Sequence, residues 1–118
     1  MKNITEDDLA MFTGTSRYYR LMPNHLLTEG AKYLADNAEC YWLIDVIASY
    51  FPILSADNGF VLTQLTVNDA KALVKLEDGN GNILVQQRIE WTDFPLSEVK
   101  LYSCFDGAIW VTMLPTEY

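Results

Sequence analysis

The sequence has little that could support metal, disulfide or phosphate chemistry. Its 118 residues include two cysteines and one histidine, His25. Two cysteines, Cys40 and Cys104, are too few for a secreted disulfide framework, and neither stands in a metal-binding spacing. The glycine patterns of phosphate-binding loops, dinucleotide-binding folds and nucleophile elbows are missing too. We therefore expect no cofactor and no metal, and the sequence leans away from an enzyme.

Positive charge is scarce as well. Eight Lys and Arg residues face sixteen Asp and Glu residues, which gives a net charge of −8. Nonspecific nucleic-acid binding needs a basic footprint, so we expect no direct nucleic-acid binding. An acidic surface that imitates the phosphate backbone of DNA is an alternative, although the acids are scattered along the chain.

Long hydrophobic runs are also lacking. The N-terminal stretch Met1–Asp8 has no apolar segment of the kind that signal peptides carry. The longest apolar run, Ala38–Phe51, covers 14 residues and is too short to span a bilayer. We expect a cytoplasmic protein without a membrane contact, in which residues 1–118 form one domain.

That apolar run predicts the helix around which the domain is built. At 100° per residue, one stripe of its apolar side chains falls on a single face, and these are Cys40, Leu43, Ile44, Ile47 and Phe51. Pro52 is expected to end the helix, because proline cannot continue the hydrogen-bond ladder. Trp42, Asp45 and Ser49 lie on the opposite face.

Asp45 has two interpretations. The simpler one is a partly exposed or structurally satisfied carboxylate. The other is a carboxylate at the floor of a pocket beside Trp42, because a buried acid must be paired or hydrogen-bonded. In that pocket Arg17 or Arg20 would approach Asp45, with Trp42 and a tyrosine as walls.

The arginine–tyrosine block supplies the remaining candidate binding residues. Arg17, Tyr18, Tyr19 and Arg20 place two of the three arginines within four residues. Such a cluster contacts an anion or stacks on a ring, or it braces an acidic protein internally. The surrounding stretch, residues 13–25, reads as a loop with at most a brief extended piece.

Two further helices are expected in residues 1–52. Thr5 is a suitable N-cap for a helix that Gly14 stops, and Thr28 caps a second helix from Glu29 to about Asp36. Residues 36–37 have poor helix propensity. Whether residues 29–51 form one helix or two stays open.

Residues 60–114 are mainly strand. Alternating or β-branched runs predict five strands, and these are 60–67, 72–77, 83–91, 99–104 and 108–114. Turn signals lie at 55–59, at 78–82 and at Asp106-Gly107, and Trp91 and Trp110 are expected in the core or on a sheet face. The predicted fold is α+β, with N-terminal helices on one face of a roughly five-stranded antiparallel meander sheet. The last strand is expected at a sheet edge, where pairing with a second copy would give a homodimer.

Several sequence blocks together resemble a family of small proteins, a domain of unknown function met in bacteria, phages and mobile elements. The blocks are Phe12-Thr-Gly-Thr15 with Tyr18-Tyr-Arg20, Leu26–Ala35, Tyr41-Trp-Leu-Ile-Asp45 with Ile47-Ala-Ser-Tyr50, Thr92–Leu96, Lys100-Leu-Tyr102 and Leu114–Tyr118. The resemblance implies an intracellular single-domain protein. It supplies no reaction, cofactor or catalytic residue.

The function expected from these observations is a non-catalytic accessory protein that binds a protein partner. Its specific form would be a phage or mobile-element factor that acts on a host defence or regulatory protein. The alternatives are a small-molecule or peptide binder using the pocket around Asp45 and Trp42, and the acidic DNA mimic.

Overall fold

The computed structural model describes residues 4–54 and 59–118. Within these residues there are three α-helices: α1 (Glu6–Ala10), α2 (Glu29–Asn37) and α3 (Tyr41–Leu54). The strands are β1 (Tyr18–Met22), β2 (His25–Thr28), β3 (Phe60–Asn68), β4 (Lys71–Glu77), β5 (Ile83–Ile89), β6 (Glu98–Phe105) and β7 (Trp110–Met113). A short 3-10 turn, η1 (Pro115–Glu117), follows β7.

All the strands belong to one sheet of seven, in the order β1-β2-β7-β6-β3-β4-β5. The α+β class is therefore confirmed, but the five-stranded antiparallel meander is wrong. The stretch expected to be a loop forms the hairpin β1–β2, and β2 pairs in parallel with β7. Because β7 also pairs with β6, it lies inside the sheet, and the expectation of an edge strand there is wrong. The edges are β1 and β5.

The central helix α3 packs as its periodicity predicts. Leu43, Ile44 and Ile47 are fully buried, and Phe51 is nearly so. The helix runs on to Leu54, so the predicted stop at Pro52 is wrong. A proline in the last turn removes only one backbone donor, and burial of Leu54 favours continuing the helix.

Two helices, not one, cover residues 29–51. The break falls at residues 38–40, slightly after the predicted position, where Glu39 adopts a left-handed φ of 52°. The predicted N-caps are confirmed: Thr28 accepts from the Ala31 N–H, and Thr5 forms a capping box with Asp8.

Turn chemistry fixes the hairpins of the second half. Asp78 accepts from the N–H groups of Asn80 and Asn82, while Gly79 and Gly81 take positive φ, so the predicted β4–β5 hairpin is confirmed. The Asp106-Gly107 turn likewise joins β6 to β7. The turn predicted at 55–59 lies almost wholly outside the described residues.

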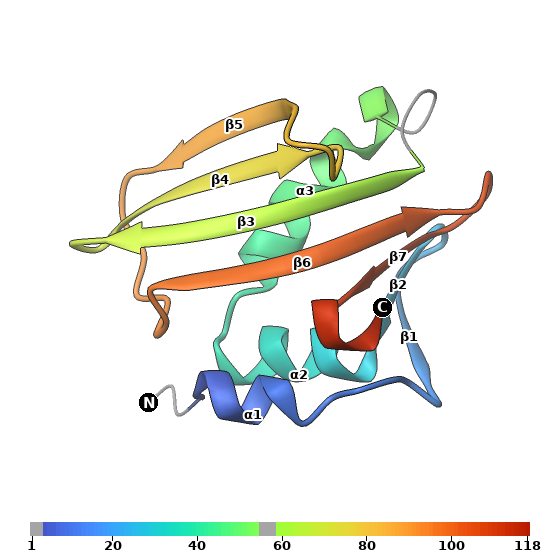
Figure 1. Cartoon of the computed structure of the whole chain (residues 1–118), viewed down its shortest axis with the longest axis horizontal. Coiled ribbons are helices and arrows are strands. Elements are labelled where there is room, and N and C mark those ends of the chain that lie inside the picture. Colours follow the sequence, from blue (N-terminus) through green and yellow to red (C-terminus); the bar gives the residue numbers. More distant parts are fainter. Residues whose placement is uncertain (1–3, 55–58) are drawn as a thin grey trace.

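Over strands β3, β4 and β5, one face of the sheet is covered and the other face is open. Figure 1 views it from the uncovered face, with α3 crossing behind β3 and β4. Along β3 and β4 buried residues alternate with partly exposed ones, and the buried set packs in the core with α3. Trp110 belongs to this core at 1% exposure, but Trp91 is 68% exposed and follows the end of β5, so it lies neither in the core nor on a strand. Trp91 lies beyond the end of β5, where the alternation of the strand no longer applies.

The end of the chain ties the sheet to α2. Glu117 accepts hydrogen bonds from the Thr28 hydroxyl at 2.6 Å and from the Gly30 N–H at 3.0 Å. A carboxylate at a helix N-terminus satisfies free backbone donors and opposes the helix dipole. The ring of Tyr118 then joins those of Phe60 and Tyr102 in mutual edge contacts, above β3 and β6.

Candidate functional site

The uncovered face of β3–β6 presents polar and charged side chains in cross-strand rows. Thr66 is paired with Leu73, and Leu73 in turn with Arg88, so these three lie in one row over β3, β4 and β5. The next row begins at Lys100 on β6 and continues through Gln64 to Lys75. Directly opposed residues in antiparallel strands stand about 4.5–5.5 Å apart at Cβ, so each row forms a continuous surface.

Half of the chain's basic residues gather on this face. Four of the eight Lys and Arg residues are placed there by strand alternation, and they are Lys71, Lys75, Arg88 and Lys100. None of them forms an ion pair with another residue in the part of the chain that the structure describes, where the one ion pair is Lys32–Asp36. We call these four residues the cationic face.

Three carboxylates share the surface: Glu90, just past the end of β5, and two on the strands. Glu98 accepts a hydrogen bond from the Gln64 amide at 2.9 Å, and Glu77 lies further along β4. The face therefore has more bases than acids in a chain where acids outnumber bases two to one.

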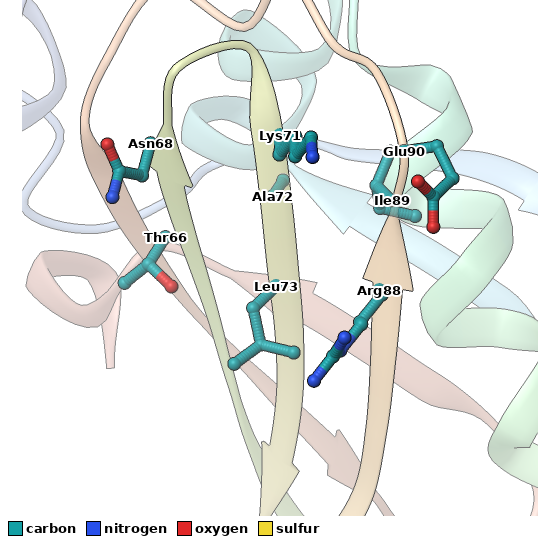
Figure 2. A pocket seen from close by; sticks show the side chains of 8 residues that line it. All are labelled: Thr66, Asn68, Lys71, Ala72, Leu73, Arg88, Ile89 and Glu90. Atoms are coloured by element: carbon teal, nitrogen blue, oxygen red, sulfur yellow. The ribbon is translucent and has the colours of Figure 1, made fainter.

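A shallow groove of about 350 Å³ lies at one end of the cationic face. Figure 2 shows Thr66 and Asn68 on one side of it, Lys71 and Leu73 along the middle strand, and Arg88 on the far side. Glu90 stands at the rim, next in sequence to Ile89, the last residue of β5. The groove thus combines two cations, a hydroxyl, an amide and an apolar floor, with one carboxylate at its rim.

This combination suits a carboxylate on an extended chain. An arginine guanidinium offers two parallel N–H donors to a carboxylate, and a lysine adds a point charge. Leu73 between them gives an apolar neighbour of the segment a place to pack. The groove holds no residue placed as a nucleophile beside a base, so its geometry favours binding.

The residues of the predicted arginine–tyrosine block lie on or next to the edge strand β1. Tyr18, Tyr19 and Arg20 lie on the edge strand β1, and Arg17 just precedes it. The Arg20 guanidinium donates to the Pro23 carbonyl at 2.7 Å, and the Arg17 N–H donates to the Glu29 carboxylate at 3.1 Å. The Arg20 contact is made by its side chain within the same hairpin, whereas the Arg17 contact is made by its backbone, and both side chains are exposed.

Trp42, Asp45 and Ser49 lie on α3, but they do not form the predicted pocket with the arginines. Asp45 is exposed and makes no ion pair with Arg17 or Arg20 among the described residues. The Ser49 hydroxyl donates to the Val46 carbonyl at 2.6 Å, not to Asp45. Asp45 is exposed on the outer side of α3, so its carboxylate meets water and does not need an arginine partner.

The negative charge of Asp45 affects the pKa of His25. Burial lowers the pKa of His25 to about 4, and the negative charge of Asp45 partly opposes that shift. His25 is 1% exposed, and its Nε2 lies 2.8 Å from Thr112 Oγ1, which lies 2.9 Å from Ser103 Oγ. This buried chain of polar groups joins three neighbouring strands: β2, β7 and β6.

Sequence reasoning missed both His25 and the cationic face. A signal for the second existed, because Lys71 and Lys75 alternate with buried Ala72 and Val74. The addition of Lys100 depends on the β3–β6 register, which sequence alternation does not reveal. For His25 there was no signal, since its partners are more than 75 residues away in sequence.

Other titratable groups are shifted by local contacts at the surface. Hydrogen bonds from Ser16 hold the pKa of Glu29 below its usual value, and the Lys32 ammonium and the Tyr41 hydroxyl do the same for Asp36. Neither group lies on the cationic face. Among the described residues, no helix is both long and apolar enough to cross a membrane.

Comparison with known proteins identifies the family of the chain. It belongs to a family of unknown function, DUF6876, whose profile matches residues 3–118. The resemblance to a domain of unknown function is thus confirmed. A search of curated proteins gives no match.

One solved structure is similar in fold: a crystal structure described as a protein of unknown function from Enterococcus faecalis. It is 18% identical, with a TM-score of 0.55, and the match covers 86% of this chain and 98% of the other. At this identity the similarity supports the fold alone.

Proposed function

We propose that this member of the DUF6876 family is a non-catalytic accessory protein that binds another protein through its cationic face. The partner would lay an acidic segment with at least one apolar residue along the groove between Thr66 and Arg88. The observation that carries the proposal is a set of four basic side chains on the uncovered side of an acidic chain's sheet, none of which makes an ion pair with a residue that the structure describes. A phage or mobile-element factor that acts on a host defence or regulatory protein is a specific form of this function.

Charge favours an acidic partner segment over the alternatives. Electrostatic complementarity at an interface steers association and selects the partner, and the groove presents Lys71 and Arg88 to it. The overall charge of −8 would repel a long nucleic-acid backbone that extends past the face. An acidic DNA mimic is less favoured, because the most open surface of the sheet carries cations.

An exposed aromatic side chain adds to the proposed surface. Trp91 directly follows Glu90 at the groove rim and is 68% exposed. Tryptophan and arginine are the residues most enriched at energetic hot spots of protein interfaces. Trp91 and Arg88 are therefore the expected anchors of the complex.

Cross-linking mass spectrometry on the intact chain tests the location of the interface. A lysine-reactive cross-linker is added to the chain bound to proteins captured from a bacterial lysate. The proposal expects cross-links to a partner through Lys71, Lys75 and Lys100. Lys32 is the internal control, because it contacts Tyr19 and Asp36 on the helix side of the molecule. Partner cross-links that run mainly through Lys32 would contradict the proposal.

A matched pair of variants tests the charge argument. The double variant Lys71→Gln with Arg88→Gln removes two charges from the groove. The control, Lys32→Gln with Arg17→Gln, removes the same charge elsewhere. We expect the groove variant to weaken capture of the cross-linked partner by at least about tenfold, since two charge-assisted hydrogen bonds are lost. Equal loss in both variants would show that only net charge matters.

A further inference from the structure

A cavity of about 420 Å³ lies on the covered side of the sheet, away from the cationic face. It is bounded by the β1–β2 turn, the end of α3 and the β6–β7 turn. Met22 and Asn24 are exposed at its mouth, while His25, Phe51 and Trp110 form buried walls. This volume is in the range of pockets that hold small molecules.

His25 contributes a polar atom that the protein leaves unsatisfied. Its Nε2 is hydrogen-bonded to Thr112 Oγ1, but its Nδ1 is buried and has no hydrogen-bond partner among residues 4–54 and 59–118. The tautomer follows from this difference. An unpaired buried N–H costs more than an unpaired lone pair, so we assign the proton to Nε2, which donates to Thr112. Nδ1 is then an acceptor.

The walls determine the charge of a suitable ligand. Of the nine residues that line the cavity, none carries a formal charge at neutral pH, although one residue in five of the chain is charged. His25 is neutral there, because burial lowers its pKa. A charged ligand would lose its hydration without gaining a partner.

The aromatic rings in the cavity wall determine the shape of a suitable ligand. Phe51 and Trp110 stack with centroids 4.1 Å apart and planes 3° apart, and Phe105 stacks on Trp110 at 4.9 Å. All three rings line the cavity, together with Ala48 and Pro52. Flat apolar walls of this kind pack well against a planar ring.

We propose that this cavity binds a small, uncharged aromatic molecule whose hydroxyl or N–H group donates a hydrogen bond to Nδ1 of His25. Nδ1 has no solvent contact in the unliganded chain, so a wall side chain must rotate to admit the donor. Phe51 is the lining side chain to which we assign this rotation, because its ring meets the imidazole edge to face at 4.9 Å. Side-chain rotations of this kind are common on binding. The site is separate from the cationic face and does not depend on that proposal.

Titration with three probes tests the chemistry of the ligand. Phenol has a ring and a donor, toluene lacks the donor, and benzoate carries a charge. In two-dimensional NMR spectra of the intact chain, we expect phenol to shift Trp110 and His25 signals saturably. Phenol should bind about fivefold more tightly than toluene, the equivalent of one hydrogen bond of about 1 kcal/mol. Benzoate should bind more weakly than either. No saturable shift with phenol, or equal affinity for phenol and toluene, would overturn the proposal.

Two substitutions at His25 distinguish the roles of its two ring nitrogens. In His25→Gln the side-chain amide N–H replaces Nε2 and keeps the bond to Thr112, but no acceptor remains near Nδ1. In His25→Asn an oxygen remains near Nδ1. We expect His25→Gln to lose the fivefold preference for phenol over toluene while it keeps its toluene affinity. A preference that persists in His25→Gln would contradict the role of Nδ1.

A blocking variant keeps the test valid if the histidine variants fail to fold. Ala48 lies on α3 and lines the cavity, whereas its neighbour Ser49 does not. Ala48→Leu should weaken the binding of both phenol and toluene by at least about tenfold, because the added side chain fills the space. Ser49→Leu, the matched control, should bind both probes as the unmodified chain does. Equal binding by the two variants would place the probes elsewhere.

Discussion

Acidification should destabilise this protein well before its carboxylates titrate, because its single histidine is buried. His25 is 1% exposed, and its pKa in the folded chain is lowered from 6.5 to about 4 by desolvation. Between these two pH values His25 is protonated in the unfolded chain but neutral in the folded chain. Stability is therefore complete above pH 6.5 and is lost as the pH falls through 6.5 towards 4.

The size of the effect follows from the same two values. Each pH unit of difference is worth about 1.4 kcal/mol, so a pKa lowered from 6.5 to about 4 corresponds to about 3 kcal/mol in total. Between pH 7.5 and pH 5.0, linkage gives a loss of about 2 kcal/mol in the free energy of unfolding. That loss is a large share of the stability of a typical domain.

Urea unfolding followed by circular dichroism, repeated at half-unit pH steps, measures this loss in the free energy of unfolding. The window is clean, because His25 is the only histidine of the chain. The carboxylates with lowered pKa, such as Asp78 and Asp106, contribute only below about pH 4. His25→Gln, which does not titrate, should have a flat profile from pH 7.5 to 5.0. Parallel profiles for the two chains, or an NMR titration that gives His25 a pKa near 6.5, would refute the reasoning.

Three further substitutions test the local energetics. Asp45→Asn should lower the pKa of His25 further, because Asp45 is the charge that raises it, and an NMR titration checks this. Gly30→Ala would place a Cβ 2.7 Å from Leu114 Cδ1 and against the Glu117 carboxylate, so we expect a loss of about 2–3 kcal/mol in urea unfolding. Ala70→Gly should stabilise the chain by about 1 kcal/mol, because Ala70 has a φ of 64° in the β3–β4 turn, and a raised melting temperature would show it.

Local signals in the sequence were enough for the elements that local contacts hold. The β4–β5 hairpin follows from the Asp78–Asn82 turn, and the buried stripe of α3 follows from a 3.6-residue period. The hairpin β1–β2 was missed because its stability comes from elsewhere. Strand β2 covers four residues and is held by parallel pairing with β7, some 85 residues later. No window of the sequence contains that contact.

The same reasoning explains the errors at the candidate site. Periodicity placed Asp45 correctly opposite the buried stripe of α3, but it could not tell whether a second layer covers that side. The structure leaves Asp45 exposed, so the requirement for a paired carboxylate disappears. The opposite error concerns His25: an isolated histidine in an expected loop is buried in the structure, and that burial lowers its pKa to about 4.

The cationic face is difficult to explain by solvation alone. An uncovered sheet face needs polar side chains, and either sign of charge meets that need. Lysine and glutamate are both disfavoured in strands, so strand propensity does not select the sign either. A chain with twice as many acids as bases would be expected to place mostly acids on β3–β6, yet four bases lie there with three acids, Glu90 at the groove rim included. Neither Lys71 nor Arg88 is neutralised by an ion pair to a described residue, and Leu73 between them is only partly buried. Recognition of an acidic segment accounts for the sign, the lack of internal partners and the apolar floor together, whereas solubility accounts only for the polarity.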